Sequence, residues 1–221
     1  MAWTATENFE SYSDNDNISG GSGGANWSGN WATPTGTVTV QDEQAVEGSL
    51  SLKYLQATNN TYETRNHTAT SGDLYYALYC STASPTNFQC NLRNGGGSQQ
   101  LVRISSTNIE AYNFSVAGWV DIGDYTAGTW LYVHHNFDQS GQTYKIRTGV
   151  SSWSAFSADF GTRDTNDITF LSIGADSQSG TTGYIDDIRA DDPFAAAGSL
   201  IKSVNGVLRA NIKSWNGVIL E

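Results

Sequence analysis

The alternation of apolar and polar residues is the feature that most constrains how this chain can fold. Period-two alternation runs along most of the sequence, whereas helical periodicity is almost absent. In TWLYVHHNFD (129–138), the residues Leu131, Val133, His135 and Phe137 fall on one face of an extended segment. Successive side chains of a strand point to opposite sides of its sheet, so this pattern predicts strands with one buried face.

The best-defined local prediction is a β-hairpin over residues 129–149. QTYKIRTG (142–149) repeats the alternation, with Tyr144 and Ile146 on one face and the lysine and arginine opposite. DQSG (138–141) separates the two runs and is typical of a turn. The two runs are therefore expected to pair as antiparallel neighbours.

The remaining strand candidates are short and are separated by clusters of Gly, Asn, Asp and Ser. They are TVTVQ (37–41), SLSLKYL (49–55), DLYYALYC (73–80), QLVRIS (100–105), ITFLSIGAD (168–176) and GYIDDIRAD (183–191). NGGGSQQ (94–100) is expected to be a loop tip, and the glycine-rich residues 18–31 a loop over one sheet. Strands at this spacing predict an all-β fold, an antiparallel two-sheet jelly-roll sandwich.

A boundary is expected where DDPFAAAGS (191–199) interrupts the pattern. Pro193 cannot donate to a sheet, and the small residues after it have little to pack. We therefore expect the main domain to cover residues 1–194 and a separate segment to cover residues 195–221.

The C-terminal segment repeats one phrase, as IKSVNGV (201–207) and IKSWNGV (212–218). Asn-Gly is the strongest two-residue signal for a tight hairpin turn, so two short hairpins are expected. Isolated hairpins are marginal in water and need a surface to cover. Two alternatives stay open: the hairpins extend the main sandwich, or they form an assembly module that docks on a neighbouring subunit. The apolar residues that would make this contact are Ile201, Val204, Ile212 and Trp215.

Composition excludes several classes of function. The net charge is −11, whereas a nucleic-acid binder is expected to be basic. No apolar run approaches the roughly 18 residues needed to cross a bilayer, so membrane insertion is not expected. MAWTATENFE has neither the charged nor the apolar region of a signal peptide. Either a leader was removed, or the protein leaves the cell by another route, such as release within a virus particle.

The two cysteines, Cys80 and Cys90, bracket CSTASPTNFQC. A two-strand hairpin around Ser84-Pro85 would bring them together as a disulfide, and two free thiols are the equal alternative. Two cysteines cannot make a zinc site alone, and the three histidines do not complete one.

No catalytic motif stands out in the sequence. Paired carboxylates on one strand, as in a Glu-X-Asp-X-Glu run, are absent, and so are the nucleophile, phosphate-loop and zinc-protease motifs. We therefore expect no enzyme. Tryptophans in small-polar surroundings are candidates for stacking on sugar rings, although aromatic residues more often pack in β cores. The candidates are Trp27, Trp31 and Trp153.

Four segments together have a familiar order: NFES (8–11), EGSLSLKYL (47–55), the hairpin 129–149 and GYIDDIRADDPF (183–194). This order resembles that of the laminin-G and concanavalin-A-like jelly rolls and of jelly-roll carbohydrate-binding modules, over about residues 5–194. The repeated IKSxNGV phrase resembles short repeats at the ends of phage and metagenomic surface proteins.

These resemblances imply one structural calcium ion, because the family often holds Ca²⁺ between acidic residues near its first and last strands. Here those residues are Glu10 and Asp187, with Asp186 beside them. The alternation in YIDDI places one of the two aspartates inward, where a carboxylate needs a partner or a cation.

They also imply a function outside catalysis. We expect a phage virion protein (a capsid decoration, head fibre or tail component) that displays the jelly roll outward and binds host-surface glycans. Residues 195–221 would anchor it to other virion proteins or to sister subunits as a homo-oligomer. The alternative is a carbohydrate-binding module of a secreted bacterial protein at the cell surface.

Overall fold

The computed structural model describes residues 5–35, 38–46, 48–55, 61–81, 87–175 and 182–190, together with four two-residue strands near the C-terminus. Within these residues every regular element is a strand, and every strand pair is antiparallel. They also contain no helix long and apolar enough to cross a membrane. The predicted all-β class is confirmed.

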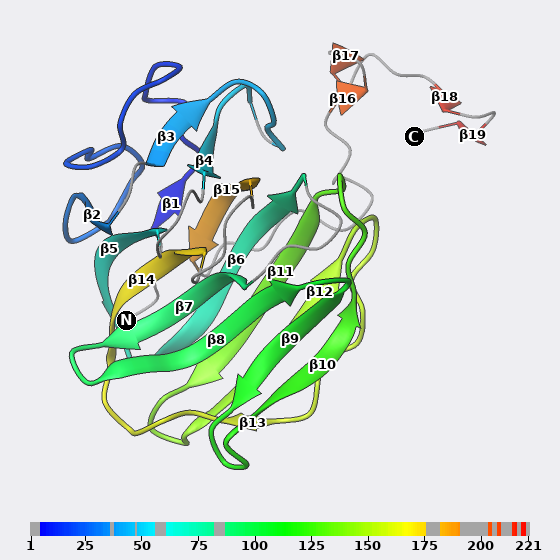
Figure 1. Cartoon of the computed structure of the whole chain (residues 1–221). Coiled ribbons are helices and arrows are strands. Elements are labelled where there is room, and N and C mark those ends of the chain that lie inside the picture. Colours follow the sequence, from blue (N-terminus) through cyan, green and yellow to red (C-terminus); the bar gives the residue numbers. More distant parts are fainter. Residues whose placement is uncertain are drawn as a thin grey trace.

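Two sheets stack face to face as a jelly-roll sandwich (Figure 1). The eight-stranded sheet has the order β13 (Phe160–Gly161), β12 (Thr143–Gly149), β11 (Leu131–Asp138), β6 (Ser71–Cys80), β15 (Thr182–Ala190), β4 (Ser51–Leu55) and β3 (Val38–Gln41), with β1 (Thr6–Glu7) beside β15. The seven-stranded sheet has the order β10 (Gly118–Asp124), β9 (Asn108–Asn113), β8 (Gly97–Ser105), β7 (Phe88–Asn94), β14 (Ile168–Ala175), β5 (Thr61–Ala69) and β2 (Trp31–Thr35).

The predicted hairpin over residues 129–149 is confirmed as β11 and β12. Its register pairs Asp138 with Thr143 and places His134 directly opposite Arg147. The predicted loop tip at residues 94–100 is shorter, because β7 and β8 pair up to Asn94 and Gly97 and only two glycines turn between them.

The core lies between the sheets and is built from alternate residues of both. Its largest fully buried side chains are Trp31, Tyr54, Tyr76, Tyr144, Phe9 and Phe88. A polar network crosses this core: the Tyr76 hydroxyl and His135 Nε2 lie 2.7 Å apart, and His135 Nδ1 lies 3.3 Å from Gln100 Oε1. The Gln100 oxygen can only accept, so Nδ1 donates to it and Nε2 accepts from the tyrosine.

The N-terminal segment covers the open edges of both sheets on one side of the molecule. Backbone hydrogen bonds join Asn15 and Asp16 to Val40 of β3, and Gly20 and Gly21 to Trp31 of β2. Free strand edges invite pairing with other chains, so this cover protects the sandwich from aggregation.

The four short strands near the C-terminus form two separate two-stranded sheets. β16 (Ser203–Val204) pairs with β17 (Val207–Leu208), and β18 (Ser214–Trp215) pairs with β19 (Val218–Ile219). The pairing places each Asn-Gly between two partnered strands, as the sequence predicts. As described, neither hairpin pairs with a strand of the two large sheets. Pro193 and the expected boundary near residue 194 lie outside the described residues.

The predicted hairpin between Cys80 and Cys90 is wrong. Cys80 ends β6 in the eight-stranded sheet, whereas Cys90 lies in β7 of the seven-stranded sheet. Both are buried, free thiols. Burial raises the pKa of the Cys90 thiol to about 12, so it stays protonated.

Candidate functional site

The outer face of the eight-stranded sheet carries a group of aromatic side chains around one histidine. They stand on the strand positions that point away from the core and on the loop after β12, and we call them the aromatic face. Its members are Tyr75, Tyr79, Trp130, Tyr132, His134, Trp153 and Phe156.

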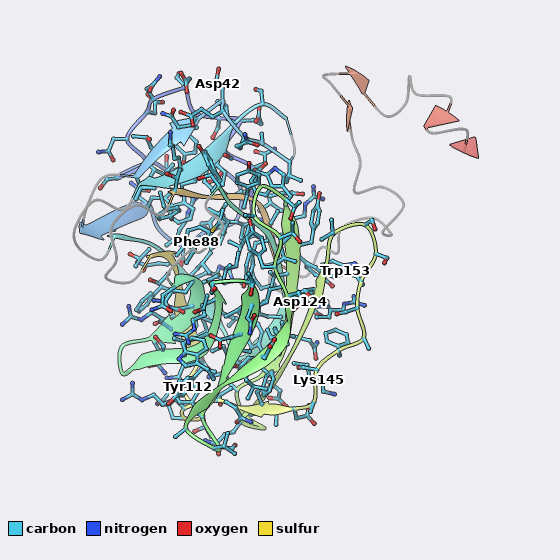
Figure 2. The ribbon with its side chains drawn as sticks, turned by 45° about the vertical axis from the view of Figure 1, so that its right-hand side comes forward. Asp42, Phe88, Tyr112, Asp124, Lys145 and Trp153 are labelled. Atoms are coloured by element: carbon cyan, nitrogen blue, oxygen red, sulfur yellow. The ribbon has the colours of Figure 1, made fainter. Side chains whose placement is uncertain are left out.

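Loop 150–159 folds back along β12 and places two of these rings. Ser154 N donates to Thr148 O over 2.8 Å, and Ser157 N donates to Ile146 O over 2.7 Å. The ring of Trp153 consequently lies 6.0 Å from that of His134, centroid to centroid. Figure 2 labels Trp153 on this loop. The loop therefore adds two aromatic rings to a face that β-strands alone would leave flatter.

Three side chains form a hydrogen-bonded row across β12, β11 and β6. Arg147 Nε donates to His134 Nδ1 over 2.8 Å, and His134 Nε2 lies 2.5 Å from Asp73 Oδ1. Since Nδ1 accepts a hydrogen bond, the proton of the neutral ring is on Nε2 and is donated to Asp73. Burial lowers the pKa of His134 below its ordinary value, although the aspartate opposes that shift. The hydrogen bond from His134 lowers the pKa of Asp73.

The guanidinium of Arg147 contacts two rings of the loop. Its central carbon is 5.0 Å from the Trp153 ring centre and 4.6 Å from that of Phe156. Phe156 remains 39% exposed, which is high for a large apolar side chain. Cation–π contacts with these two rings help to hold the guanidinium in place.

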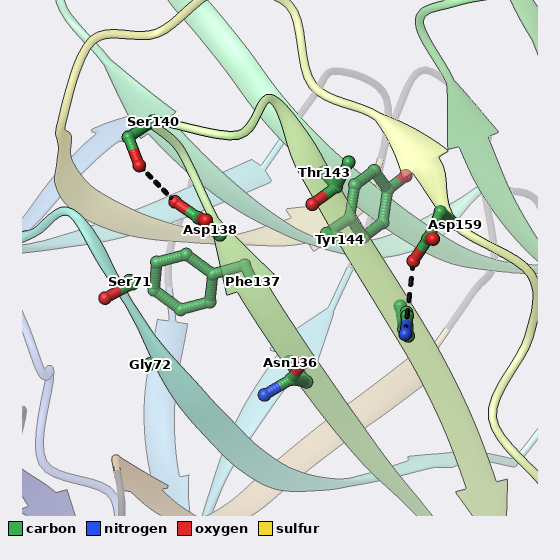
Figure 3. Close-up of a pocket in the computed structure, with 10 residues that line it drawn as sticks. Ser71, Gly72, Asn136, Phe137, Asp138, Ser140, Thr143, Tyr144 and Asp159 are labelled. Atoms are coloured by element: carbon green, nitrogen blue, oxygen red, sulfur yellow. Dashed lines mark hydrogen bonds and ion pairs between the residues drawn. The ribbon is translucent and has the colours of Figure 1, made fainter.

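A polar pocket of about 610 Å³ adjoins this group at the end of the hairpin (Figure 3). Asn136 connects the two regions, because it lines the pocket and its Nδ2 donates to Asp73 over 3.0 Å. Two further carboxylates at the pocket have partners: Asp138 Oδ1 accepts from Ser140 Oγ, and Asp159 forms a 3.3 Å ion pair with Lys145. The pocket thus offers fixed acceptors and donors but little apolar surface.

Of the three predicted tryptophans, Trp153 alone belongs to the aromatic face. The expectation that Trp31 lies near the surface is wrong: it is 1% exposed and its Nε1 donates to Glu7 Oε2. Trp27 is half-buried and stacks against Trp31 and the Arg65 guanidinium. Both tryptophans therefore pack the glycine-rich segment against the sandwich and hold that segment in place.

The predicted calcium ligands bind protein groups. Glu10 Oε1 accepts from the backbone N–H groups of Ser49 and Leu50, and Asp186 Oδ2 accepts from Val46 N. Asp187 Oδ1 accepts from Arg189 Nε. Over the described part of the chain, no group of three or more His, Cys, Asp or Glu side chains is placed to hold a metal ion. Calcium at these residues stays a prediction.

Strict alternation at residues 186–188 is wrong, because β15 contains a bulge there. Its register against β6 shifts between Asp186 and Arg189, and Asp187 has a positive φ of 53°. Both aspartates are buried as a result. A bulge re-aims side chains that simple alternation would send to opposite faces.

The structure also places the predicted assembly residues only in part. Val204 pairs with Val207, and Trp215 pairs with Val218. Ile201 and Ile212 lie outside the described residues, as do the side-chain surroundings of the whole segment.

Sequence reasoning missed most of the aromatic face. Asp73, Phe156 and the pocket carried no motif, and Arg147 was assigned only to the solvent side of its strand. The sequence indicated that the two strands pair, but a turn at residues 138–141 implies a register two residues away from the observed one, in which Phe137 pairs with Tyr144 and His134 lies opposite Arg147. Nothing in a single sequence indicates that loop 150–159 would return over that pair.

Comparisons with known proteins support the fold. No protein-family model matches the chain, and no curated protein matches it. Among solved structures, domain 4 of the GH43 extracellular arabinanase AbnA from Geobacillus stearothermophilus, in complex with arabinotriose, is similar with a TM-score of 0.55 and 12% identity. The likeness covers 89% of this chain and 95% of that domain.

Two further structures have the same architecture. A sialidase is similar over 72% of this chain, with a TM-score of 0.56 and 10% identity. A receptor-binding domain of botulinum neurotoxin type G is similar over 77%, with a TM-score of 0.50 and 12% identity. This chain spans only 16% of the sialidase and 45% of the toxin domain. At these identities the likeness shows one shared feature, the jelly-roll sandwich fold.

Proposed function

We propose that the chain is a non-enzymatic glycan-binding module and that its aromatic face is the binding surface. The observation that carries the proposal is the pair of loop rings, Trp153 and Phe156, beside His134, whose partner Asp73 is hydrogen-bonded to a residue of the polar pocket, Asn136. Sugar rings present apolar C–H faces and hydroxyl edges, so they suit an aromatic platform beside fixed polar groups. The similar arabinanase domain, whose structure contains arabinotriose, supports this assignment.

The carboxylates of this face support binding without hydrolysis. Glycosidases need one carboxylic acid whose raised pKa keeps it protonated as the general acid. Here hydrogen bonds lower the pKa of Asp73, chiefly from His134, and of Asp138, chiefly from Ser140. Both are therefore suited to accept hydrogen bonds from sugar hydroxyls.

Binding can be tested by titrating a glycan panel into the full chain by calorimetry. We expect saturable binding, and we expect replacing Trp153 and Phe156 together by alanine to weaken it at least tenfold. The matched control is Trp119→Ala, since Trp119 stacks on Arg103 on the outer face of the other sheet. Equal losses for both changes, or no saturable binding to any glycan, would contradict the proposal.

We further propose that the module is displayed on a phage virion and anchored through residues 195–221. The separate pairing of the two C-terminal hairpins supports an independent segment. So does charge: that segment is +2, from Lys202, Arg209, Lys213 and Glu221, while the other 194 residues carry 8 basic and 21 acidic side chains, or −13. A basic segment is attracted to the acidic sandwich of a sister subunit.

The alternative is a carbohydrate-binding module of a secreted bacterial surface protein, for which the fold and the aromatic face argue equally well. The two settings differ in what the C-terminal segment does. Display on a virion requires it for incorporation into the particle, whereas a free module binds its glycan as a monomer.

A further inference from the structure

Arg147 has hydrogen-bonding capacity that the protein does not use. Its one hydrogen bond within the described chain is from Nε to His134 Nδ1. The two terminal nitrogens carry four N–H donors, and neither nitrogen makes a described hydrogen bond or ion pair. By contrast Arg65, Arg103 and Arg189 each have a carboxylate oxygen within 2.6 Å. Among the described residues, Arg147 is thus a cation with no carboxylate in hydrogen-bond or ion-pair contact, in a chain of net charge −11.

The surroundings of Arg147 fix its orientation before any ligand binds. Trp153 and Phe156 both contact the guanidinium, and His134 accepts a hydrogen bond from Nε. His134 is itself held by Asp73 through its other ring nitrogen. A planar fork held in this way matches the two oxygens of a carboxylate, which arginine binds in bidentate fashion.

We propose that the ligand of the aromatic face is an acidic sugar, a uronic acid whose ring carboxylate pairs with the terminal nitrogens of Arg147. This inference rests on the proposed glycan-binding function. The exposed ring of Phe156 offers the sugar an apolar contact. Asn136, opposite Lys145 in the hairpin register, lies on the same face of the sheet and reaches toward the pocket, where hydroxyl groups would bind.

Three carboxylates of the aromatic face and the adjoining pocket would repel an anion, but each already has hydrogen-bond or ion-pair partners within the protein. Asp73 accepts hydrogen bonds from His134 and Asn136, and it lies across the imidazole ring from Arg147. Asp159 is paired with Lys145. The third, Asp138, accepts from a hydroxyl and a backbone N–H at the far end of the hairpin. Arg147 is therefore the cation of this face whose terminal nitrogens make no described ion pair and can receive an incoming carboxylate.

The test compares each acidic sugar with its uncharged counterpart on the unmodified full chain. The probes are oligogalacturonate, oligomannuronate and hyaluronan fragments, each beside its carboxyl-reduced form, titrated by calorimetry. We expect at least tenfold tighter binding of one acidic form, and we expect that preference to decrease as salt is raised from 50 to 500 mM. Equal affinity for an acidic sugar and its reduced form overturns this inference and leaves glycan binding in place. Saturable binding of neutral glycans alone also overturns the acidic-sugar inference and leaves glycan binding in place. If no glycan binds, both the inference and the proposed glycan-binding function are overturned.

Variants then assign the preference to the guanidinium. Arg147→Lys keeps the charge but loses the planar fork, so we expect it to remove the preference for the acidic form. Arg163→Gln is the control, because Arg163 is an exposed arginine beside Gly97 at the tip of the β7–β8 hairpin. A preference that survives Arg147→Lys, or that Arg163→Gln removes equally, contradicts the assignment. Unchanged thermal melting shows that each variant is folded.

Discussion

Individual polar residues that are buried among apolar side chains hold distant parts of this chain together. Glu7 of β1 and Arg65 of β5 form a buried ion pair, and Glu7 also accepts from Phe9 N over 2.9 Å. Arg65 Nη2 and Nε donate to the backbone oxygens of Gly23 and Gly29. One arginine therefore fixes the glycine-rich segment to a strand of the seven-stranded sheet.

Breaking this pair should be costly. Arg65→Met leaves the Glu7 carboxylate buried without its cation, and we expect the free energy of unfolding to fall by about 3–5 kcal/mol. Urea denaturation measures the change. Arg163→Met removes an exposed arginine and should change the free energy of unfolding by less than about 0.5 kcal/mol. Similar small losses for both variants would show that the pair contributes little.

His135 makes the stability of the sandwich depend on pH. Burial lowers its pKa to about 3, whereas an unfolded chain titrates near the ordinary value of about 6.5. Between these values the unfolded state binds one more proton than the folded state, so the free energy of unfolding falls as pH falls. The full slope for one group is about 1.4 kcal/mol per pH unit.

His135→Gln should remove this contribution. The variant is expected to be less stable at pH 7, where the polar network is disturbed, and to lose stability more slowly between pH 6 and 4.5. Urea midpoints across that range give both slopes. Parallel slopes in the two proteins would mean that His135 is not the group whose protonation unfolds the sandwich.

Among the elements, loop 150–159 depends on one glycine. A Cβ added to Gly149 would lie 2.5 Å from the backbone oxygen of Ser152, closer than such atoms approach. Gly149→Ala should therefore displace the loop, change the fluorescence of Trp153 and weaken glycan binding about tenfold, about 1.4 kcal/mol. In Gly95→Ala the added Cβ meets nothing within 4 Å, so binding should be unchanged. Unchanged glycan binding by Gly149→Ala would show that loop 150–159 does not contribute to the binding site.

How far the sequence predicts these elements depends on how regularly each one alternates. The 129–149 hairpin, which alternates cleanly around a turn, was predicted with its faces, whereas its register is known only from the structure. β5 and β7 were missed, because TYETRNHTA and FQCNLRN carry many polar residues; in β7 these are buried, since that strand is covered on both sides. The bulge at Asp187 leaves no trace in the pattern either, since only the backbone shows its positive φ.

The candidate site, like the strands, was predicted from the sequence only in part. Trp153 was a candidate because of its small-polar neighbours, and Trp31, with similar neighbours, is buried. Local composition does not say whether a loop folds inward or outward, because that depends on specific hydrogen bonds: the Trp31 ring donates to Glu7, whereas the loop that carries Trp153 is bonded to β12. The row from Arg147 to Asp73 joins three strands, and pairing between β6 and β11 spans about 60 residues of sequence.

For the whole molecule, the open question is whether residues 195–221 act on the sandwich or on another subunit. We expect the full chain to form oligomers and residues 1–194 to be a folded monomer, because the described strands of each C-terminal hairpin pair with each other and not with the two large sheets. Light scattering with circular dichroism measures both. Two folded monomers would exclude self-assembly and leave docking on a different protein. An unfolded truncation would mean that the hairpins complete the sandwich.

The pairing of β1 with β15 sets Thr6 beside Arg189, so the described sandwich starts and finishes at one spot on its surface. A unit built this way is portable. It can be inserted into an exposed loop of an unrelated protein or repeated in tandem, because its two connections to the rest of a chain leave from adjacent strands. Recombination can consequently move such a unit between carriers without redesigning either, and the carrier rather than the sandwich then decides where the aromatic face is presented.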